Sequence, residues 1–277
     1  MKAEIHARLR AMATWKLTLE YKGTRYQGWQ EQPNARTIQG ELRAAAEEFF
    51  QDKVDIGGSG RTDAGVHALA QVAHLRSVRK HPAEQVRLSL NDKLPSDIHI
   101  LSLEPAPERF HARHSATMRS YLYQISKRRT AFAKEFVWWA KPALDLARMH
   151  DCAQLFEGRH DFWSFTERPQ EQGSTVVVVD QVRIVECGEL ILVRTVASHF
   201  LWKMVRRLVG VMIQVAAGTL EPDRVQSFLV SQSKEVGQWT APPSGLFLER
   251  VLYPGESLPD QIRPAIPVFS SGPETAS

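Results

Sequence analysis

Residues 57–68 have the sequence Gly57-Gly58-Ser59-Gly60-Arg61-Thr62-Asp63-Ala64-Gly65-Val66-His67-Ala68, with four glycines in nine residues and a single carboxylate among them. Glycines cluster where the backbone takes a positive φ or where another molecule approaches it closely, because glycine loses the most conformational freedom on folding. The stretch lacks the Gly-Lys-Ser/Thr ending of a P-loop and the third glycine of a dinucleotide fingerprint. We therefore expect this loop to present an acid and an arginine rather than to cradle a phosphate.

The loop lies between two expected strands in the first half of the chain. Alternating apolar residues predict strands, and apolar residues at helical spacing predict helices. The resulting β-α-β-β-α-β order is typical of a split βαβ, ferredoxin-like arrangement. In chain order we expect a strand at 15–21, a helix at 38–49, strands at 53–56 and 69–76, a helix at 82–92 and a strand at 98–103.

The second half repeats this order of elements without a repeat of residues. We expect strands at 117–125, 176–185, 190–196 and 246–253, and helices at 146–156 and 200–216. Two such α+β halves, packed side by side, would leave a cleft between them. The predicted organisation is an extension at 1–13, an N-terminal half at 14–113, a C-terminal half at 114–254 and a disordered tail at 255–277.

Composition excludes several classes of protein. No apolar run approaches the roughly 20 residues that cross a bilayer, and no secretory signal is recognisable, so we expect a cytoplasmic protein. Cys152 and Cys187 have no neighbouring cysteine or suitably spaced histidine, which argues against a disulfide framework or a zinc site. We expect both to be small, apolar, reduced side chains.

Basic residues exceed acidic ones by 35 to 31, for a formal charge of +4, and their distribution is informative. The segments 109–129 and 194–207 contain no acid, and the first interleaves arginines with Phe110, Tyr121 and Tyr123. Arginines among aromatic residues suit a phosphate backbone with unstacked bases. Two such segments favour a polyanionic partner.

Several motifs together resemble the tRNA pseudouridine synthase A family, from about Leu17 to Tyr253. The main ones are Gly60 to Ala68 with Gln71-Val72, Phe110-His111-Ala112-Arg113, Tyr121-x-Tyr123, and Phe200-Leu201-Trp202-Lys203-Met204-Val205-Arg206. Smaller matches are Gly28-Trp29-Gln30, Leu94-Pro95-Ser96-Asp97-Ile98, Gly158-x-His160-Asp161-Phe162 and Gly245-Leu246-x-Leu248. Each is weak alone, but their order and spacing together are specific.

The resemblance implies a fold and an activity. The family has the pseudouridine synthase fold, in which two ferredoxin-like halves form a long, mainly antiparallel sheet with flanking helices and a central basic cleft. Its members convert uridine to pseudouridine at positions 38 to 40 of the tRNA anticodon stem-loop, without cofactor or metal. They act as homodimers, so the resemblance implies tRNA and a second copy of the chain as partners.

The resemblance also implies roles for particular residues. Asp63 is the expected nucleophile, acting either at the sugar or at C6 of uracil, and the residues leave this choice open. An acid in this role must be ionised near neutral pH, and a neighbouring cation favours that form while desolvation opposes it. Arg206 is the expected ion-pair partner of Asp63. Had the loop stood alone, a turn-capping role for Asp63 would be equally reasonable.

Tyr121 is expected to stack on the target base and to help remove the C5 proton, although Tyr123 lies on the same face and one of the two would serve the core. The target uridine must be flipped out of its stem. Arg61 is expected to occupy the vacated space, with a simple phosphate contact as its alternative. His67 could hydrogen-bond either the loop or the RNA, in a supporting role. The remaining candidates for contact with RNA, as phosphate contacts, are Arg113, Lys127, Arg128, Lys203 and Arg207.

Three alternatives are weighed against this reading. A non-catalytic RNA-binding protein would fit the halves and the basic segments, but an acid in its cleft would repel phosphate. A synthase of the same family with another RNA target is not excluded by the catalytic residues. A metal-dependent nuclease would need clustered carboxylates, and Asp63 has no acidic neighbour within the ten residues that follow it.

Overall fold

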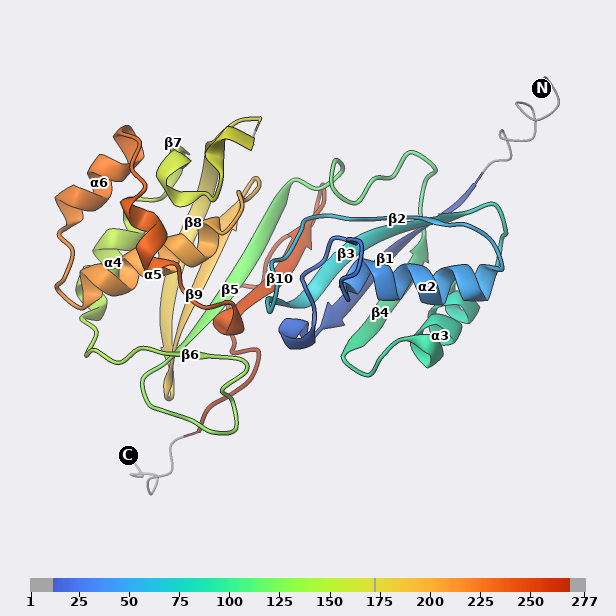
Figure 1. Ribbon diagram of the computed structural model, residues 1–277, viewed down its shortest axis with the longest axis horizontal. Coiled ribbons are helices and arrows are strands. Elements are labelled where there is room, and N and C mark those ends of the chain that lie inside the picture. Colours follow the sequence, from blue (N-terminus) through green and yellow to red (C-terminus); the bar gives the residue numbers. More distant parts are fainter. Residues whose placement is uncertain (1–11, 172, 270–277) are drawn as a thin grey trace. The chain divides into compact units, whose positions relative to one another are not determined.

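The computed structural model describes residues 12–171 and 173–269 (Figure 1). The chain divides into two compact units, Met1–Thr117 and Met118–Ser277. The division falls after Thr117, whereas the sequence predicts it after Arg113. The predicted N-terminal extension falls largely outside the described residues, which begin at Met12.

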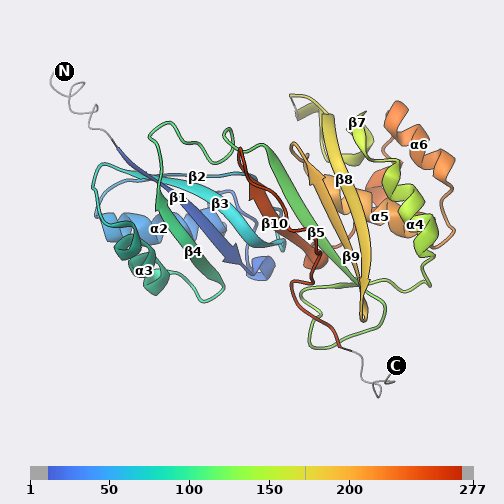
Figure 2. The same cartoon turned by 180° about the vertical axis from the view of Figure 1, so that it is seen from behind.

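The first unit is an antiparallel sheet with the strand order β4-β1-β3-β2. Helices α2 and α3 lie together on one face of it, as the two opposite views show (Figures 1 and 2). This order is that of a split βαβ unit and confirms the α+β prediction for this half. Its elements are β1 (Ala13–Tyr21), α2 (Ile38–Phe50), β2 (Asp55–Gly58), β3 (His67–Ser77), α3 (Ala83–Lys93) and β4 (Ile98–Pro105), with a short 3-10 turn, η1 (Gly23–Arg25).

The sequence determines these elements locally. In β1 the side chains of Trp15, Leu17, Leu19 and Tyr21 are buried, while Glu20 is exposed, as the alternation predicts. Helix α2 begins where Thr37 caps it, because the Thr37 hydroxyl accepts a hydrogen bond from the Gly40 N–H. The buried face of each element therefore follows from its apolar period.

The second unit has the antiparallel order β10-β5-β9-β8-β7, with the short β6 pairing parallel to β5. Its first four strands repeat the order of the first unit, which confirms the predicted repeat of elements. The helices α4, α5 and α6 cover one face of this sheet (Figure 2). The elements are β5 (Met118–Ser126), β6 (Trp138–Trp139), α4 (Leu146–Gln154), β7 (Gly158–Asp161), η2 (Trp163–Phe165), η3 (Pro169–Glu171), β8 (Val176–Cys187), β9 (Leu190–Ala197), α5 (Met204–Ala216), α6 (Pro222–Val230), η4 (Glu235–Trp239), η5 (Pro243–Gly245) and β10 (Leu246–Leu252).

Helix α5 begins later than predicted. The apolar spacing predicts a helix from residue 200, but the helix starts at Met204, and Lys203 before it has a left-handed backbone with φ of 62°. Residues 200–203 form a loop whose apolar side chains resemble a helical face only in sequence. Strands β6 and β7 and helix α6 were not predicted.

The C-terminal segment differs from the predicted disordered tail over residues 254–269. Ile262 and Val268 are buried, and the side-chain oxygen of Gln124 accepts a hydrogen bond from the Ala265 N–H at 2.6 Å. The segment is therefore packed against the second unit. The remainder of the predicted tail, residues 270–277, lies outside the described residues.

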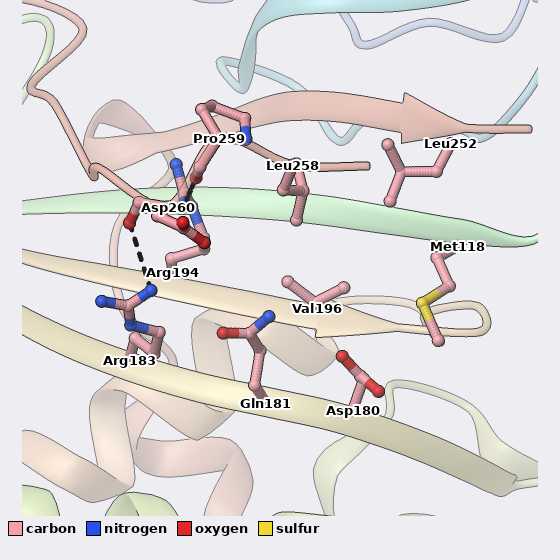
Figure 3. Close-up of a pocket in the computed structure, with 10 residues that line it drawn as sticks. All are labelled: Met118, Asp180, Gln181, Arg183, Arg194, Val196, Leu252, Leu258, Pro259 and Asp260. Atoms are coloured by element: carbon pink, nitrogen blue, oxygen red, sulfur yellow. Dashed lines mark hydrogen bonds between the residues drawn. The ribbon is translucent and has the colours of Figure 1, made fainter. Parts of the chain in front are cut away.

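Arg194 fastens this segment to the sheet. Its side chain is 2% exposed, is paired with Glu249, and donates to the Pro259 carbonyl at 2.8 Å. Nearby, Arg183 donates to the Asp260 carbonyl at 3.1 Å, and Figure 3 shows both arginines directed toward the segment. A buried charge requires such partners, since burying it alone is costly. A pocket of about 160 Å³ lies among these groups.

The described residues contain no helix of the length and apolarity needed to span a membrane. The two cysteines differ from each other. Cys152 is buried, whereas Cys187 is exposed at the end of β8, contrary to the expectation of two apolar side chains.

Candidate functional site

The loop that carries Asp63 is held on both sides of that residue. The Thr62 hydroxyl lies 2.8 Å from the Tyr21 hydroxyl, and the Thr62 carbonyl accepts a hydrogen bond from the Trp29 N–H at 3.0 Å. The Asp63 carbonyl accepts a hydrogen bond from the Val66 N–H at 3.1 Å, which closes a turn. The Asp63 carboxyl therefore projects from a backbone with a defined conformation, as a reacting group requires.

Two glycines near Asp63 are required by backbone conformation or close approach. Gly65 has φ of +78° and donates to the Tyr26 carbonyl at 3.3 Å. Gly28 has φ of +89°, and a Cβ there would lie 2.4 Å from the Thr62 carbonyl oxygen. A side chain at either position would be strained. The Gly28-Trp29-Gln30 motif thus serves to bring the chain against the Asp63 loop.

Gly57 and Gly58 make room for rings of the protein itself rather than for a bound molecule. A Cβ on Gly57 would lie 2.4 Å from the His74 ring, and one on Gly58 would lie 2.5 Å from the Trp29 ring. Gly60 differs, since a Cβ there would meet nothing within 4 Å. Only part of the glycine cluster is therefore open to an approaching substrate.

Residues outside the loop support it, and sequence reasoning missed them. Gln71 accepts a hydrogen bond from the Ser59 hydroxyl at 2.7 Å and donates to the Gly60 carbonyl at 3.0 Å. Tyr26, whose carbonyl holds Gly65, donates its hydroxyl to Asp97 at 2.5 Å. Both Gln71 and Asp97 belong to motifs quoted above, which was the only signal of their role.

His67 and Arg61 differ in their access to RNA. The side chain of His67 is buried, and its Nδ1 accepts a hydrogen bond from the Gly23 N–H at 3.1 Å, so it fixes the end of the loop. This placement differs from the predicted contact with RNA and agrees with support of the loop. Arg61 is exposed, as is Arg113 in the Phe110–Arg113 motif.

That motif is anchored to β3 by two hydrogen bonds. The Ala112 N–H donates to Nδ1 of His74 at 3.2 Å, and Arg76 donates to the Phe110 carbonyl at 2.8 Å. His74 is buried, with its Nε2 at 3.7 Å from Asp55 and its ring centroid at 4.6 Å from that of His111. Burial, reinforced by the charge of Arg76 and opposed by Asp55, lowers the pKa of His74 to about 4.

His74 predicts an acid-sensitive stability. Its folded pKa lies below the unfolded value of about 6.5, so the folded state binds fewer protons, and the stability it contributes is lost as pH falls from 6.5 toward 4. We expect the free energy of unfolding to fall by about 1 to 2 kcal/mol between pH 7 and pH 5 through this group. Denaturant titration of the wild type and of His74→Gln, which keeps an acceptor for the Ala112 N–H, measures it. Equal pH slopes for the two proteins would contradict the assignment.

In the second unit, the structure distinguishes the two tyrosines of β5. Tyr123 is fully buried and donates its hydroxyl to the Pro242 carbonyl at 2.7 Å. Burial raises the pKa of the Tyr123 hydroxyl well above its usual value. The hydroxyl therefore stays protonated and is a poor base for removing a proton from the substrate. Tyr121 is 7% exposed, and its ring meets that of Phe200 edge to face at a centroid distance of 4.9 Å. Tyr123 therefore takes the core position.

Arg206 lies in the first turn of α5 and is half-buried. Its Nε donates to the Ala241 carbonyl at 2.7 Å, and the Ala241 N–H donates back to the Arg206 carbonyl at 3.0 Å. This reciprocal pair fixes the direction in which the guanidinium extends.

Arg207 differs from the predicted phosphate contact. It is 8% exposed, and its guanidinium donates to the Thr166 carbonyl and to the Glu167 carboxylate. A guanidinium enclosed in this way serves the protein interior, since buried charge needs a partner. Apolar neighbours at helical spacing in α5 were a signal that this side of the helix is buried.

The other predicted phosphate contacts are spread over the second unit. Lys127 is exposed and pairs with Glu186 at 3.2 Å. Arg128 donates to the Phe269 carbonyl at 2.6 Å. Both residues follow the end of β5. At about 3.3 Å per residue of an extended strand, their Cα atoms lie about 20 Å along the chain from that of Tyr121. Lys203 pairs with Glu167 at 3.4 Å.

No group of three or more histidine, cysteine or acidic side chains in the described parts of the chain is arranged to hold a metal ion. The pocket of Figure 3 lies on the second unit beside the C-terminal segment, and its lining contains none of the predicted site residues.

Comparisons with known proteins agree on a family. A sequence model described as tRNA pseudouridine synthase matches residues 18–115 and 152–254. The tRNA pseudouridine synthase A of Agrobacterium fabrum is 37% identical over 260 residues, covering 92% of this chain and 97% of that protein. The one of Nitrobacter winogradskyi is 39% identical over 247 residues, covering 88% and 97%. A chain of a Cbf5-Nop10-Gar1 crystal structure covers 72% of this chain and 53% of its own, at 11% identity and a TM-score of 0.30, a likeness too low to assign a fold.

Proposed function

The chain belongs to the tRNA pseudouridine synthase family, and from this premise we propose that it isomerises uridine to pseudouridine at positions 38, 39 or 40 of the tRNA anticodon stem-loop. It is an isomerase that acts on tRNA. The observation that carries the choice of site is the Asp63 loop, which hydrogen bonds hold on both sides of one carboxylate. A protein that only binds RNA has no use for an acid held in this way.

The reaction breaks the N1–C1′ bond, turns the uracil, and joins C5 to C1′ with loss of the C5 proton. The Asp63 carboxylate assists by capturing C1′, by taking the 2′ proton, or by adding to C6 of the uracil. Each route needs the carboxylate within bonding distance of one atom of a flipped nucleotide. The fixed backbone at Thr62 and Gly65 supports such placement.

Three further residues take part in the proposal. Arg206 neutralises and orients the Asp63 carboxylate, a role supported by the anchoring of its Nε on Ala241. Tyr121 stacks on the flipped uracil, and its hydroxyl assists removal of the C5 proton. Arg61, exposed two residues before the acid, fills the space that the uracil leaves.

The proposal also includes contacts between basic side chains and the RNA backbone. Arg113 and Lys127 are exposed and suited to phosphate contact, and Arg128 follows Lys127 along the chain. His67 and Arg207 support the protein instead. The homodimer and the central basic cleft are predictions from the family, and the cytoplasmic location is a prediction from the sequence.

The test uses synthetic anticodon stem-loops that each carry one uridine, tritiated at C5, at position 38, 39 or 40. We expect the purified protein to release tritium from these RNAs without added metal, because isomerisation expels the C5 hydrogen. A stem-loop with its labelled uridine elsewhere in the stem is the control. Binding of all the RNAs without tritium release would support the RNA-binding alternative, and release from the control alone would indicate another target.

A further inference from the structure

Trp202 is an exposed aromatic side chain with two cations over its ring. It lies two residues before α5 and is 38% exposed. The Arg168 guanidinium lies 5.3 Å and the Lys203 ammonium 5.5 Å from the ring centroid. Both distances are within the range of cation–π attraction. The arrangement therefore combines an aromatic surface with two positive charges at one place on the second unit.

Both cations stand on left-handed backbone, which is unfavourable for residues other than glycine. Among the described residues, four non-glycine residues have positive φ: Asn34, Gln51, Arg168 and Lys203. Asparagine tolerates this conformation, and Gln51 ends helix α2, where it is ordinary. The two that lack such an explanation are the residues over the Trp202 ring. Strain of this kind is retained where it positions a functional group.

Hydrogen bonds join the two loops that carry these residues. The Trp202 carbonyl accepts from the Glu167 N–H at 3.0 Å and from the Thr166 hydroxyl at 3.2 Å. The Glu167 carboxylate in turn binds Lys203 and Arg207. Arg168 also pairs with Glu171 at 3.3 Å, so three cations (Arg168, Lys203 and Arg207) face two carboxylates and the cluster keeps one net positive charge. The backbone of Trp202 is thus held in place, and the exposed Arg168 side chain lies over its ring while paired with Glu171.

From this we propose that Trp202, with Arg168 and Lys203, forms a stacking platform for one unpaired base of the substrate RNA. An indole face takes any base by stacking, and adjacent cations attract the phosphates that flank it. This proposal rests on the proposed function, because it assigns the contact to a nucleotide near the reacting uridine. A protein partner would be expected to meet a larger apolar surface than one indole.

The platform lies within reach of the reacting centre. Trp202 lies four positions before Arg206, and the chain between their Cα atoms spans at most about 14 Å. At about 3.4 Å per stacked nucleotide, this distance corresponds to about four nucleotides or fewer. The loop supplies the unpaired nucleotides within this distance of the reacting uridine, so the proposal places the stacked base in the loop of the same anticodon arm. The platform would select uridines that lie near single-stranded RNA over uridines inside a long duplex.

The test compares Trp202→Ala and Trp202→Phe with the wild type, and Phe132→Ala serves as the matched control, because Phe132 is fully exposed in the same unit. We expect Trp202→Ala to raise KM about 5- to 150-fold with little change in kcat, the range of one base stack, and Trp202→Phe to recover most of the loss. An RNA series with one abasic loop nucleotide each identifies the base. The abasic RNA that the wild type binds most weakly should bind to Trp202→Ala with the same affinity as the intact RNA does.

Two results would overturn the platform. One is an unchanged KM and Kd in Trp202→Ala. The other is an equal added loss in Trp202→Ala and wild type for every abasic RNA. To separate failure of the platform from failure of the proposed function, each Trp202 substitution is also made in the Asp63→Ala protein, and the dissociation constant for RNA is measured. A protein that isomerises no uridine would still reveal there whether Trp202 binds a base. Thermal melting of each variant identifies loss of folding, and Trp202→Phe keeps the proposal testable if Trp202→Ala unfolds.

Discussion

Replacing Asp63 with alanine is expected to lower pseudouridine formation by roughly 10⁴-fold or more while leaving RNA binding in place. Deleting a group that bonds to the substrate in the reaction has effects of this size. The Asp63 backbone is held through Thr62 and Val66 rather than through its carboxyl alone, so the loop should keep its shape in the variant. Single-turnover conversion of an anticodon stem-loop measures the loss, and filter binding measures the affinity.

Asp63→Asn sharpens this test, because the amide keeps the size of the carboxyl but supplies neither a nucleophile nor a base. We expect it to be as inactive as Asp63→Ala. Asp52→Asn is the matched control in the same unit, since Asp52 is exposed and follows α2. Conversion by Asp63→Ala within tenfold of the wild-type rate would contradict the assigned chemistry.

Replacing Arg206 with alanine is expected to lower kcat about 10²- to 10³-fold, the usual cost of removing a preorganised charge partner from a reacting group. In the proposal its guanidinium holds the Asp63 carboxylate, while its Nε is committed to Ala241. Arg206→Lys should recover only part of the rate, because lysine keeps the charge but lacks both that Nε–H and the planar fork. Single-turnover rates at saturating RNA give the values.

The control is Arg224→Ala, which removes an arginine from the surface of α6, where it pairs with Glu235. It should leave kcat unchanged. The role assigned to Arg206 predicts that the loss appears in kcat rather than in affinity for RNA. A rise in Kd with unchanged kcat would instead identify Arg206 as a phosphate contact.

The fold could be predicted from the sequence wherever the buried residues recur at the regular spacing of a strand or a helix. The alternation at 15–21 predicted β1, and the apolar stripe of α2 predicted a helix whose bounds differ by one residue at its end. In such segments the spacing of the apolar residues, which form the face that packs on the core, indicates the secondary structure. The repeat of strand order in the second unit followed from the same reasoning.

Two departures arise where tertiary contacts override the local pattern. The apolar residues of 200–203 suggested a helix, but Lys203 has a left-handed backbone and begins α5 late. Segment 254–269 has no period, yet Arg194 and Gln124 hold its carbonyl and amide groups. Hydrogen bonds between residues so distant along the chain leave no local pattern in the sequence.

The candidate site likewise contains residues that the sequence motifs identify and residues that only the folded structure reveals. Motif matches single out Asp63, Tyr121 and Arg206, and their catalytic roles stay predictions. The residues that hold the loop, such as Gln71 and Tyr26, could not be assigned, since their role depends on contacts formed only after folding. Arg207 was misassigned for the related reason that an arginine inside a protein and one on its surface look alike in sequence.

Mapping pseudouridine across total tRNA from cells that lack the protein tests the proposed function most directly. The tRNAs of such cells should contain uridine in place of pseudouridine at positions 38 to 40, and other pseudouridines should remain. Expression of the wild-type chain should restore these positions, whereas Asp63→Ala should not. Unchanged pseudouridine at all three positions, or restoration by Asp63→Ala, would contradict the assignment.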